Sequence, residues 1–278
     1  MSSEYGKNPK LSYNKYLKVK ELINLQETLS KPTSHDELLF IVIHQTYELW
    51  FKQILHEIDA TMNWLNEDRV FRANHSLRVV VEIEKILVSQ IHVLETMAPI
   101  GFLEFRDELK PASGFQSMQF RELEFLSGAK DEKLMKFFAE DEFSAENLKK
   151  RFNNPSLADV FWKLLERKGH KVSTESEKIN AIVKILEKTE KNPEIYILQD
   201  LLLDHDKHVS LWRYHHVLMV ERMLGAKRGT GGSDGAGYLK TTLSKRIFPE
   251  IWEARTHLAI NSNEREFDPS SLCPHVPE

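Results

Sequence analysis

A histidine-rich stretch followed by a glycine-rich stretch is the part of this sequence best suited to chemistry. Between residues 198 and 225, apolar side chains and histidines recur at steps of three and four, which is typical of one buried helix face. The shared face carries Leu201, His205, His208, Trp212, His216, Met219 and Met223. The sequence GTGGSDGAG follows at 229–237. Imidazoles on an apolar face suit a bound metal or haem, and a glycine-rich segment suits a lid over it.

Periodicity does not decide which of two adjacent histidines faces a ligand. His216 is in phase with Trp212 and Met219, whereas His215 is in phase with Leu218. A basic nitrogen on an apolar face suits the axial ligand of a haem iron. A four-ligand zinc site is less favoured, because the helix offers no cysteine and no tight carboxylate–histidine group around His216.

Plainer interpretations of the same stretch stay open. Each histidine could be an ordinary core residue, and Asp204, His205 and His208 could hold a non-haem metal. The glycine-rich segment lacks the lysine of a P-loop, and Asp234 occupies the third-glycine position of a dinucleotide motif. It could be a simple connector, or a lid that uses backbone N–H groups and the Thr230 hydroxyl.

Two further residues have both a structural and a functional interpretation. His44 lies in the apolar run LLFIVIHQTYELWF, where it could be a core histidine or a second imidazole facing a pocket. Arg106 could pair with nearby acidic residues on the surface, or its planar fork could bind a carboxylate. Phe102, Leu109 and Ser113 are in helical register with Arg106 and would give it an apolar surround.

The bulk properties describe an ordinary globular chain. Its 278 residues are 41% hydrophobic and 29% charged, with a net charge of −4. This balance does not favour nucleic acid or an anionic membrane as a partner. The only cysteine is Cys273, so no intrachain disulfide can form, which suits the cytoplasm. Neither a signal peptide nor a bilayer-spanning apolar run is visible.

Prolines separate long stretches with helical spacing, so the sequence predicts an all-α, bundle-type domain with long antiparallel helices. A capping box at Ser34 and Glu37 should begin the second helix. The expected helices cover about 11 to the late twenties, 36–66, 70–97, 119–126, 133–138, 157–167, 175–188, 193–224 and 238–258, with 99–118 less regular and an interruption at Pro249. The expected division is an N-terminal segment 1–30, a main domain 31–260 and an irregular tail 261–278.

Four of these segments together resemble the tryptophan 2,3-dioxygenase family. They are HQTYELWFKQILHEID at 44–59, FRDELKPASGFQSMQFR at 105–121, WRYHHVLMVERMLG at 212–225 and GTGGS at 229–233. Their order and separation also fit, so the resemblance extends over nearly all of the chain up to about residue 258. Asp234 departs from the family, in which serine is common at this position.

The resemblance implies a homotetrameric enzyme with one b-type haem per subunit. Such an enzyme would use O2 to cleave the indole C2–C3 bond of L-tryptophan and give N-formyl-L-kynurenine, the first step of the kynurenine pathway. His216 would be the axial haem ligand, with Trp212 hydrogen-bonded to its other ring nitrogen. His44 would accept the indole N–H, and Arg106 would bind the substrate carboxylate.

The resemblance also assigns the remaining site residues. Thr230 would hold the amino-acid end of the substrate, and Tyr13 and Tyr16 would complete the pocket of a neighbouring subunit. The pocket lining would comprise Phe40, Phe102, Leu109 and Ser113. Two alternatives remain beside this function: a non-catalytic haem sensor or carrier, and a relative that oxygenates another indole.

Overall fold

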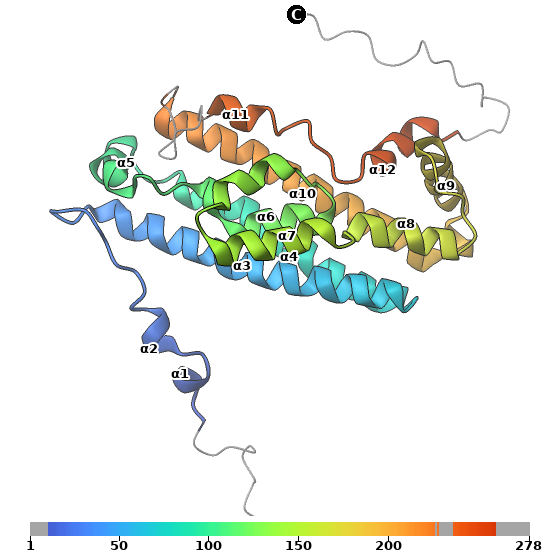
Figure 1. The fold of residues 1–278 in the computed structure, drawn as a ribbon, viewed down its shortest axis with the longest axis horizontal. Coiled ribbons are helices and arrows are strands. Elements are labelled where there is room, and N and C mark those ends of the chain that lie inside the picture. The colour runs from blue at the N-terminus through green and yellow to red at the C-terminus, as the bar shows by residue number, and fades with distance from the viewer. Residues whose placement is uncertain (1–10, 226, 228–235, 260–278) are drawn as a thin grey trace, which may run out of the picture.

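The computed structural model describes residues 11–225, 227 and 236–259. Every regular element in these residues is a helix, which confirms the all-α prediction. The longest are α3 (His35–Asn66), α4 (Val70–Leu94) and α10 (Pro193–Leu224), and α4 packs against both of the others. Figure 1 shows α3 and α4 as an antiparallel pair with α10 lying alongside.

The direction of α10 is fixed by side-chain contacts at both ends of α4. Asn74 Nδ2 near the start of α4 donates to the Glu194 carbonyl near the start of α10, at 2.9 Å. Near the other end, the rings of His92 and His215 lie 5.1 Å apart. The two helices therefore run parallel, and both run antiparallel to α3. The start of α3 and the end of α10 meet at the same end of the bundle.

Apolar side chains at helical spacing explain why these segments pack as long helices. On α3, Ile43, Tyr47, Ile54, Ile58 and Leu65 are buried at steps of four and seven. Each fully buried aliphatic side chain of this kind contributes about 1.5–3 kcal/mol through removal of apolar surface from water. The three-residue turn 67–69 between α3 and α4 leaves no room for any pairing other than an antiparallel one.

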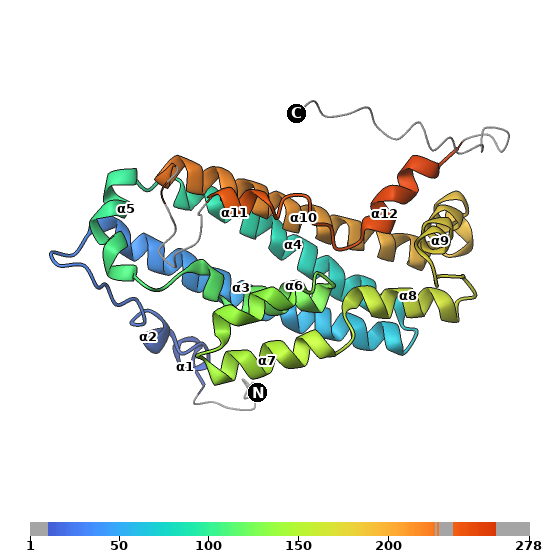
Figure 2. The same ribbon diagram turned by 45° about the horizontal axis from the view of Figure 1, so that its top comes forward.

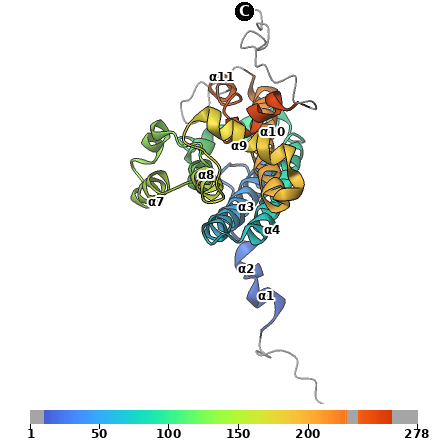
Figure 3. The same cartoon turned by 90° about the vertical axis from the view of Figure 1, so that its right-hand side faces the viewer.

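Shorter elements close the two ends and one side of the bundle. α5 (Pro99–Arg106) lies at the end where α3 begins, while α9 (Glu175–Glu187) and α12 (Pro249–Glu253) lie at the other end (Figure 2). Viewed along the bundle, α6, α7 and α8 form a layer beside α3 (Figure 3). Their bounds are Met118–Ser127, Glu142–Asn153 and Leu157–Arg167. The chain also forms α11 (Ala236–Lys240) and 3-10 turns at Asp107–Leu109, Gly114–Gln116, Glu132–Phe138, Thr189–Lys191 and Ala254–His257.

The predicted helix at 238–258 is present only in part, because residues 241–248 are not helical, and two further predictions for the helices were wrong. The N-terminal segment forms two four-residue helices, α1 (Tyr13–Tyr16) and α2 (Val19–Leu22), and not one continuous helix. Lys18 separates them with a left-handed φ of 53°, which an α-helix cannot contain. Helix α7 was missed, because its sequence EFSAENLKKRFN is mostly polar and buries only Ser144 and Leu148.

The predicted capping box at the start of α3 is also wrong, although the helix begins where it was expected. Ser34 makes no side-chain cap to α3 and instead donates to Glu104 Oε2 at 2.9 Å. The Glu37 carboxylate accepts the backbone N–H groups of Leu29 and Ser30, at 2.6 and 3.1 Å. Both side chains therefore tie the start of α3 to neighbouring segments.

Within the described residues, no single helix has the length and apolar composition to cross a membrane. The bent pair Val70–Leu94 and Pro99–Leu109, with a 92° angle, satisfies those two criteria only when taken together.

Candidate functional site

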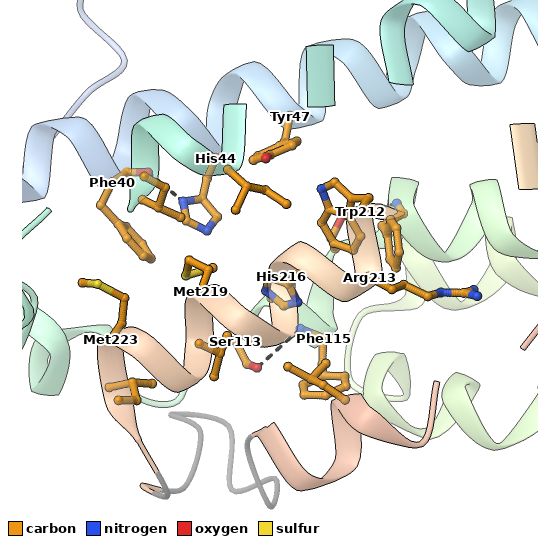
Figure 4. A pocket seen from close by; sticks show the side chains of 18 of the residues that line it. Phe40, His44, Tyr47, Ser113, Phe115, Trp212, Arg213, His216, Met219 and Met223 are labelled. Atoms are coloured by element: carbon orange, nitrogen blue, oxygen red, sulfur yellow. Dashed lines mark hydrogen bonds between the residues drawn. The ribbon is translucent and has the colours of Figure 1, made fainter. Parts of the chain in front are cut away.

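An apolar cavity of about 270 Å³ lies between the start of α3 and the end of α10. The end of α4, helix α5, the segment 113–124 and the α11 region supply the remaining walls. Figure 4 shows side chains from α3 and α10 facing each other across this space. The wall residues used below are Phe40, His44, Tyr47, Glu48, Phe102, Arg106, Ser113, Phe115, Arg121, Glu124, Trp212, Arg213, His216, Met219 and Met223. A concave, mostly apolar pocket with a few convergent polar groups is typical of a small-molecule or cofactor site.

The structure distinguishes the two adjacent histidines that periodicity left open. His216 lies in the cavity wall between Trp212 and Met219, which precede and follow it by about one helical turn. His215 does not line the cavity, and its ring packs edge-on against His92 of α4 at 5.1 Å. His216 is therefore the imidazole that a ligand in the cavity would meet.

The His216 imidazole is neutral at physiological pH. Burial, together with smaller effects of the nearby His44 and Arg121, lowers its pKa to about 4. No hydrogen bond in the described part of the chain uses either of its ring nitrogens. A neutral imidazole with an available lone pair is the form that binds a metal ion.

Trp212 contacts His216 in a different way from the one expected. The two rings stack at 5.0 Å between centroids and 10° between planes. An indole N–H points outward in the plane of its own ring, so this parallel arrangement does not give the expected hydrogen bond to His216. Among the described residues, Trp212 Nε1 is buried and has no hydrogen-bond partner.

His44 presents a hydrogen-bond acceptor to the cavity. Its Nδ1 lies 2.7 Å from the Phe40 carbonyl, which can only accept, so Nδ1 carries the proton and Nε2 keeps its lone pair. The ring is open to the cavity and lies 4.1 Å from the Phe40 ring, which follows from their four-residue spacing on α3. Burial lowers the pKa of His44, against opposing effects of the Phe40 carbonyl and Glu48. The side chain is therefore a neutral acceptor at physiological pH.

Most of the predicted pocket residues lie in the cavity wall. Arg106 is the last residue of α5, and Phe102 precedes it by one turn and packs on Phe40 at 5.7 Å between ring centroids. Ser113 lines the cavity and caps the following 3-10 turn through its hydroxyl. Leu109 is half-buried against the core and is not part of the cavity wall.

Three predicted residues cannot be placed in the cavity of this chain. Tyr13 and Tyr16 on α1 are 75% and 71% exposed, and the main helix contacts of α1 are with α2. Figure 1 shows this segment projecting away from the bundle. Thr230 lies outside the described residues.

A buried charge network in the cavity wall received no role from the sequence. Arg121 Nη1 donates to Glu124 Oε2 at 2.5 Å, and Arg213 Nη2 donates to Glu124 Oε1 at 2.8 Å. Two arginines and one glutamate leave one positive charge in excess. Arg121 Nε is also buried without a hydrogen-bond partner among the described residues. This wall is therefore suited to an anionic group in the cavity.

A second network joins the His44 helix to the segment that carries Ser113. Glu48, one turn after His44, accepts from Ser117 Oγ at 2.6 Å and from Gln119 Nε2 at 2.8 Å. Gln119 also donates to the Glu48 carbonyl at 2.9 Å. Motif membership was the available signal for both networks, because Glu48, Arg121 and Arg213 stand in the motifs quoted above.

The alternative of a non-haem metal site on α10 is wrong. Among the described residues, no group of three or more His, Cys, Asp or Glu side chains could hold a metal ion. His205 Nδ1 instead pairs with Glu84 Oε1 at 2.6 Å, and His208 Nδ1 donates to the Asp204 carbonyl at 2.7 Å.

The residues around the cavity fit a haem. His216 offers a neutral imidazole on one wall, and the aromatic and methionine side chains offer an apolar surround for a porphyrin. The unpartnered Nε of the buried Arg121, with the excess positive charge beside it, suits the carboxylates that a b-type haem carries.

Comparison with known proteins agrees with these observations. The family model described as tryptophan 2,3-dioxygenase matches residues 2–169 and 154–258. A tryptophan 2,3-dioxygenase from Herpetosiphon aurantiacus is 45% identical over 260 residues, which cover 89% of this chain and 98% of the relative. Proteins of the same name from a Nocardioides species and from Caulobacter vibrioides are 45% and 41% identical, with 95% and 98% of their lengths covered and 89% of this chain in each case. The chain belongs to the tryptophan 2,3-dioxygenase family and is an oxidoreductase enzyme.

Proposed function

We propose that this enzyme uses a b-type haem, one per subunit, to insert O2 across the indole C2–C3 bond of L-tryptophan. The product would be N-formyl-L-kynurenine, the first product of the kynurenine pathway. The observation that carries the proposal is the arrangement of His216 and His44 on two walls of one apolar cavity, with Arg106 in a third wall. His216 is a neutral ligand for the haem iron, His44 is a neutral acceptor for the indole N–H, and Arg106 is a cation for the substrate carboxylate.

His216 would hold the haem iron, and Arg121 would receive a haem carboxylate. When bound, the haem supplies the iron centre that activates O2. The chain itself supplies position: His44 Nε2 accepts the indole N–H, and the Arg106 guanidinium binds the carboxylate of the amino acid. These two anchors would fix both ends of the substrate, so that the C2–C3 bond is held in one orientation. Phe40 and Phe102 exclude water from the indole.

A sensor or carrier of haem has no requirement for a carboxylate-binding arginine in the cavity wall. Arg106 therefore favours catalysis on a free amino acid over simple haem storage, and over the oxygenation of an indole that has no carboxylate.

The reconstituted protein tests this function directly. We expect a Soret band, a change in that band on addition of L-tryptophan, and a product with both oxygen atoms derived from 18O2. Absorption spectroscopy and mass spectrometry measure these three results. Absence of a Soret band after haem addition would contradict the cofactor, and unlabelled product would contradict the reaction.

The proposed role of His44 predicts how L-tryptophan affinity depends on pH. Because the pKa of His44 is lowered below its ordinary 6.5, the ring should keep its acceptor lone pair throughout the range above pH 6.5. Affinity should weaken only on acidification below pH 6.5, as Nε2 gains a proton and can no longer accept. Dissociation constants measured from pH 5 to 8 check this. His44→Ala is the control, and its affinity should not show this weakening at acidic pH. A loss of affinity with its midpoint above pH 6.5 would contradict the assignment.

We also propose that the N-terminal segment completes a neighbouring subunit's pocket in a homotetramer. This proposal is supported by eight large apolar side chains between residues 11 and 29 that are exposed to solvent in the single chain. They are Leu11, Tyr13, Tyr16, Leu17, Leu22, Ile23, Leu25 and Leu29. Many exposed large apolar side chains in one segment are typical of a protein interface.

Deletion of residues 1–24 should therefore lower both oligomer size and turnover, because it removes the apolar contacts and both tyrosines together. Light scattering after size exclusion and steady-state turnover measure the two effects. The full-length double variant Tyr13→Ala/Tyr16→Ala is the matched control for the tyrosine side chains alone. A truncated monomer with full activity would rule out shared pockets.

A further inference from the structure

Three buried polar side chains in the middle of the bundle form a hydrogen-bonded chain that the proposed reaction does not use. Ser127 Oγ lies 2.9 Å from His205 Nε2, and His205 Nδ1 lies 2.6 Å from Glu84 Oε1. Ser127 and His205 have no exposed surface, and Glu84 is 3% exposed. The order serine–histidine–glutamate is that of a hydrolase triad, but a serine without exposed surface cannot meet a substrate. Any role of these three side chains must therefore be exerted on neighbouring side chains.

The free end of this buried chain and the Trp212 indole share one small cavity. Glu84 Oε2 and Trp212 Nε1 are both buried, and neither has a hydrogen-bond partner among the described residues. Both residues line a cavity of about 10 Å³. Buried polar atoms without partners are rare in folded proteins. A cavity of this size holds one water molecule when it offers two to four polar partners.

His208 also lines this cavity and carries an imidazole nitrogen that can accept a hydrogen bond. Its Nδ1 lies 2.7 Å from the Asp204 carbonyl, which can only accept, so Nδ1 carries the proton and Nε2 is an acceptor. His208 lines the cavity together with Glu84 and Trp212, and the remaining wall residues are apolar or aromatic: Phe51, Leu87, Phe120, Leu123 and Val209. One donor and two acceptors match the bonding capacity of a single water.

We propose that one buried water molecule joins Trp212 to Glu84, and that Glu84 is thereby a positioning residue for the imidazole of His216. The water accepts the indole N–H and donates to Glu84 Oε2 and His208 Nε2. The indole, held in place, stacks on His216 at 5.0 Å with 10° between the planes. The ring orientation of His216 then depends on the buried chain, as outer partners commonly orient a metal-bound histidine. This role rests on the proposed function, whereas the water site does not.

Tyr47 is the competing partner for the Trp212 N–H. Its hydroxyl donates to the Leu87 carbonyl at 2.9 Å, and its ring meets the Trp212 ring edge-on at 6.2 Å. Burial raises the pKa of Tyr47, and the nearby indole N–H opposes that rise. That opposing effect is the effect of a Trp212–Tyr47 side-chain hydrogen bond, so Tyr47 competes directly with the water, although the atomic positions leave Trp212 Nε1 without a partner among the described residues. A test must separate these two partners.

Ultraviolet resonance Raman spectroscopy of the apo-protein reads the hydrogen bond at the indole N–H. The difference between wild type and Trp212→Phe isolates the band of this indole. We expect a hydrogen-bonded position in wild type and a shift toward the free-indole position in Glu84→Gln. The band should not move in Tyr47→Phe, or in the matched control Glu82→Gln, whose 61% exposed side chain pairs with Lys85 on the same helix. A shift in Tyr47→Phe with none in Glu84→Gln overturns the proposal.

Two further measurements keep the test decisive if Glu84→Gln folds poorly. A crystal structure of the wild-type protein should show one water within hydrogen-bond distance of Trp212 Nε1 and Glu84 Oε2, and a dry cavity overturns the site. In the ferrous holoprotein, Glu84→Gln should shift the iron–imidazole stretching band while haem content stays normal. An unmoved band overturns the positioning role. Failure of the wild type to bind haem would instead overturn the proposed function, without affecting the apo-protein result.

Discussion

Replacement of His216 by alanine is expected to abolish tight haem binding, while His215→Ala should keep haem content near that of wild type. His216 offers the neutral imidazole in the cavity wall, and its pKa of about 4 keeps it unprotonated at every pH of ordinary use. His215 packs against His92 and does not line the cavity. Loss of the ligand itself should exceed the roughly 10–100-fold effect of losing an outer partner of a metal ligand.

Haem content per subunit and the Soret maximum measure this difference. Both variants should keep the far-ultraviolet circular dichroism of a helical protein, because neither imidazole makes a hydrogen bond within α10. Added imidazole should restore a Soret band to His216→Ala, since the alanine leaves space beside Trp212 for a free ligand. Normal haem content in His216→Ala, together with loss in His215→Ala, would reverse the assignment.

Replacement of Arg106 by leucine should weaken L-tryptophan binding by about 2–5 kcal/mol, the cost of leaving a buried carboxylate without its partner. Tryptamine, which lacks the carboxylate, should lose much less affinity, because it makes no use of the guanidinium. The comparison separates a direct contact from a general effect on folding.

Calorimetric titration of both ligands into the wild type and the variant provides the measurement. Lys110→Leu is the matched control, since Lys110 follows α5, pairs with Asp107 at the surface and lies outside the cavity wall. Equal losses for L-tryptophan and tryptamine in Arg106→Leu would show that the arginine supports the fold and does not bind the carboxylate.

The sequence was most informative where a feature depends on neighbours along one helix. The bounds of α3 and α10 were predicted to within a residue, because long runs of apolar side chains at helical spacing determine them. The four-residue spacing of Phe40 and His44 on α3 likewise explains why their rings lie together. Helix α7 was missed because its apolar positions are too few to show a period.

Contacts between distant segments could not be predicted from spacing. Arg213 and Glu124 are 89 residues apart in the sequence, and Ser127 and His205 are 78 apart, so no local pattern marks either pair. The side chain of Trp212 illustrates the same limit. Its helical position on the His216 face was predicted, but whether it stacks or donates depends on a ring rotation that Tyr47 of α3 restricts from outside α10.

The two histidine-bearing walls of the cavity differ in how folding brings them together. The turn 67–69 lets α3, which carries His44, pair with α4 as a local hairpin. The contacts Asn74–Glu194 and Glu84–His205 join residues 120 and 121 apart, and closing a loop of that length costs about 4 kcal/mol of chain entropy. Pairings of high sequence separation slow folding, so α10 should dock onto a hairpin that has already formed. The cavity wall with His44 should therefore form before the wall with His216. The protein should become able to bind haem only after this second, slower folding step.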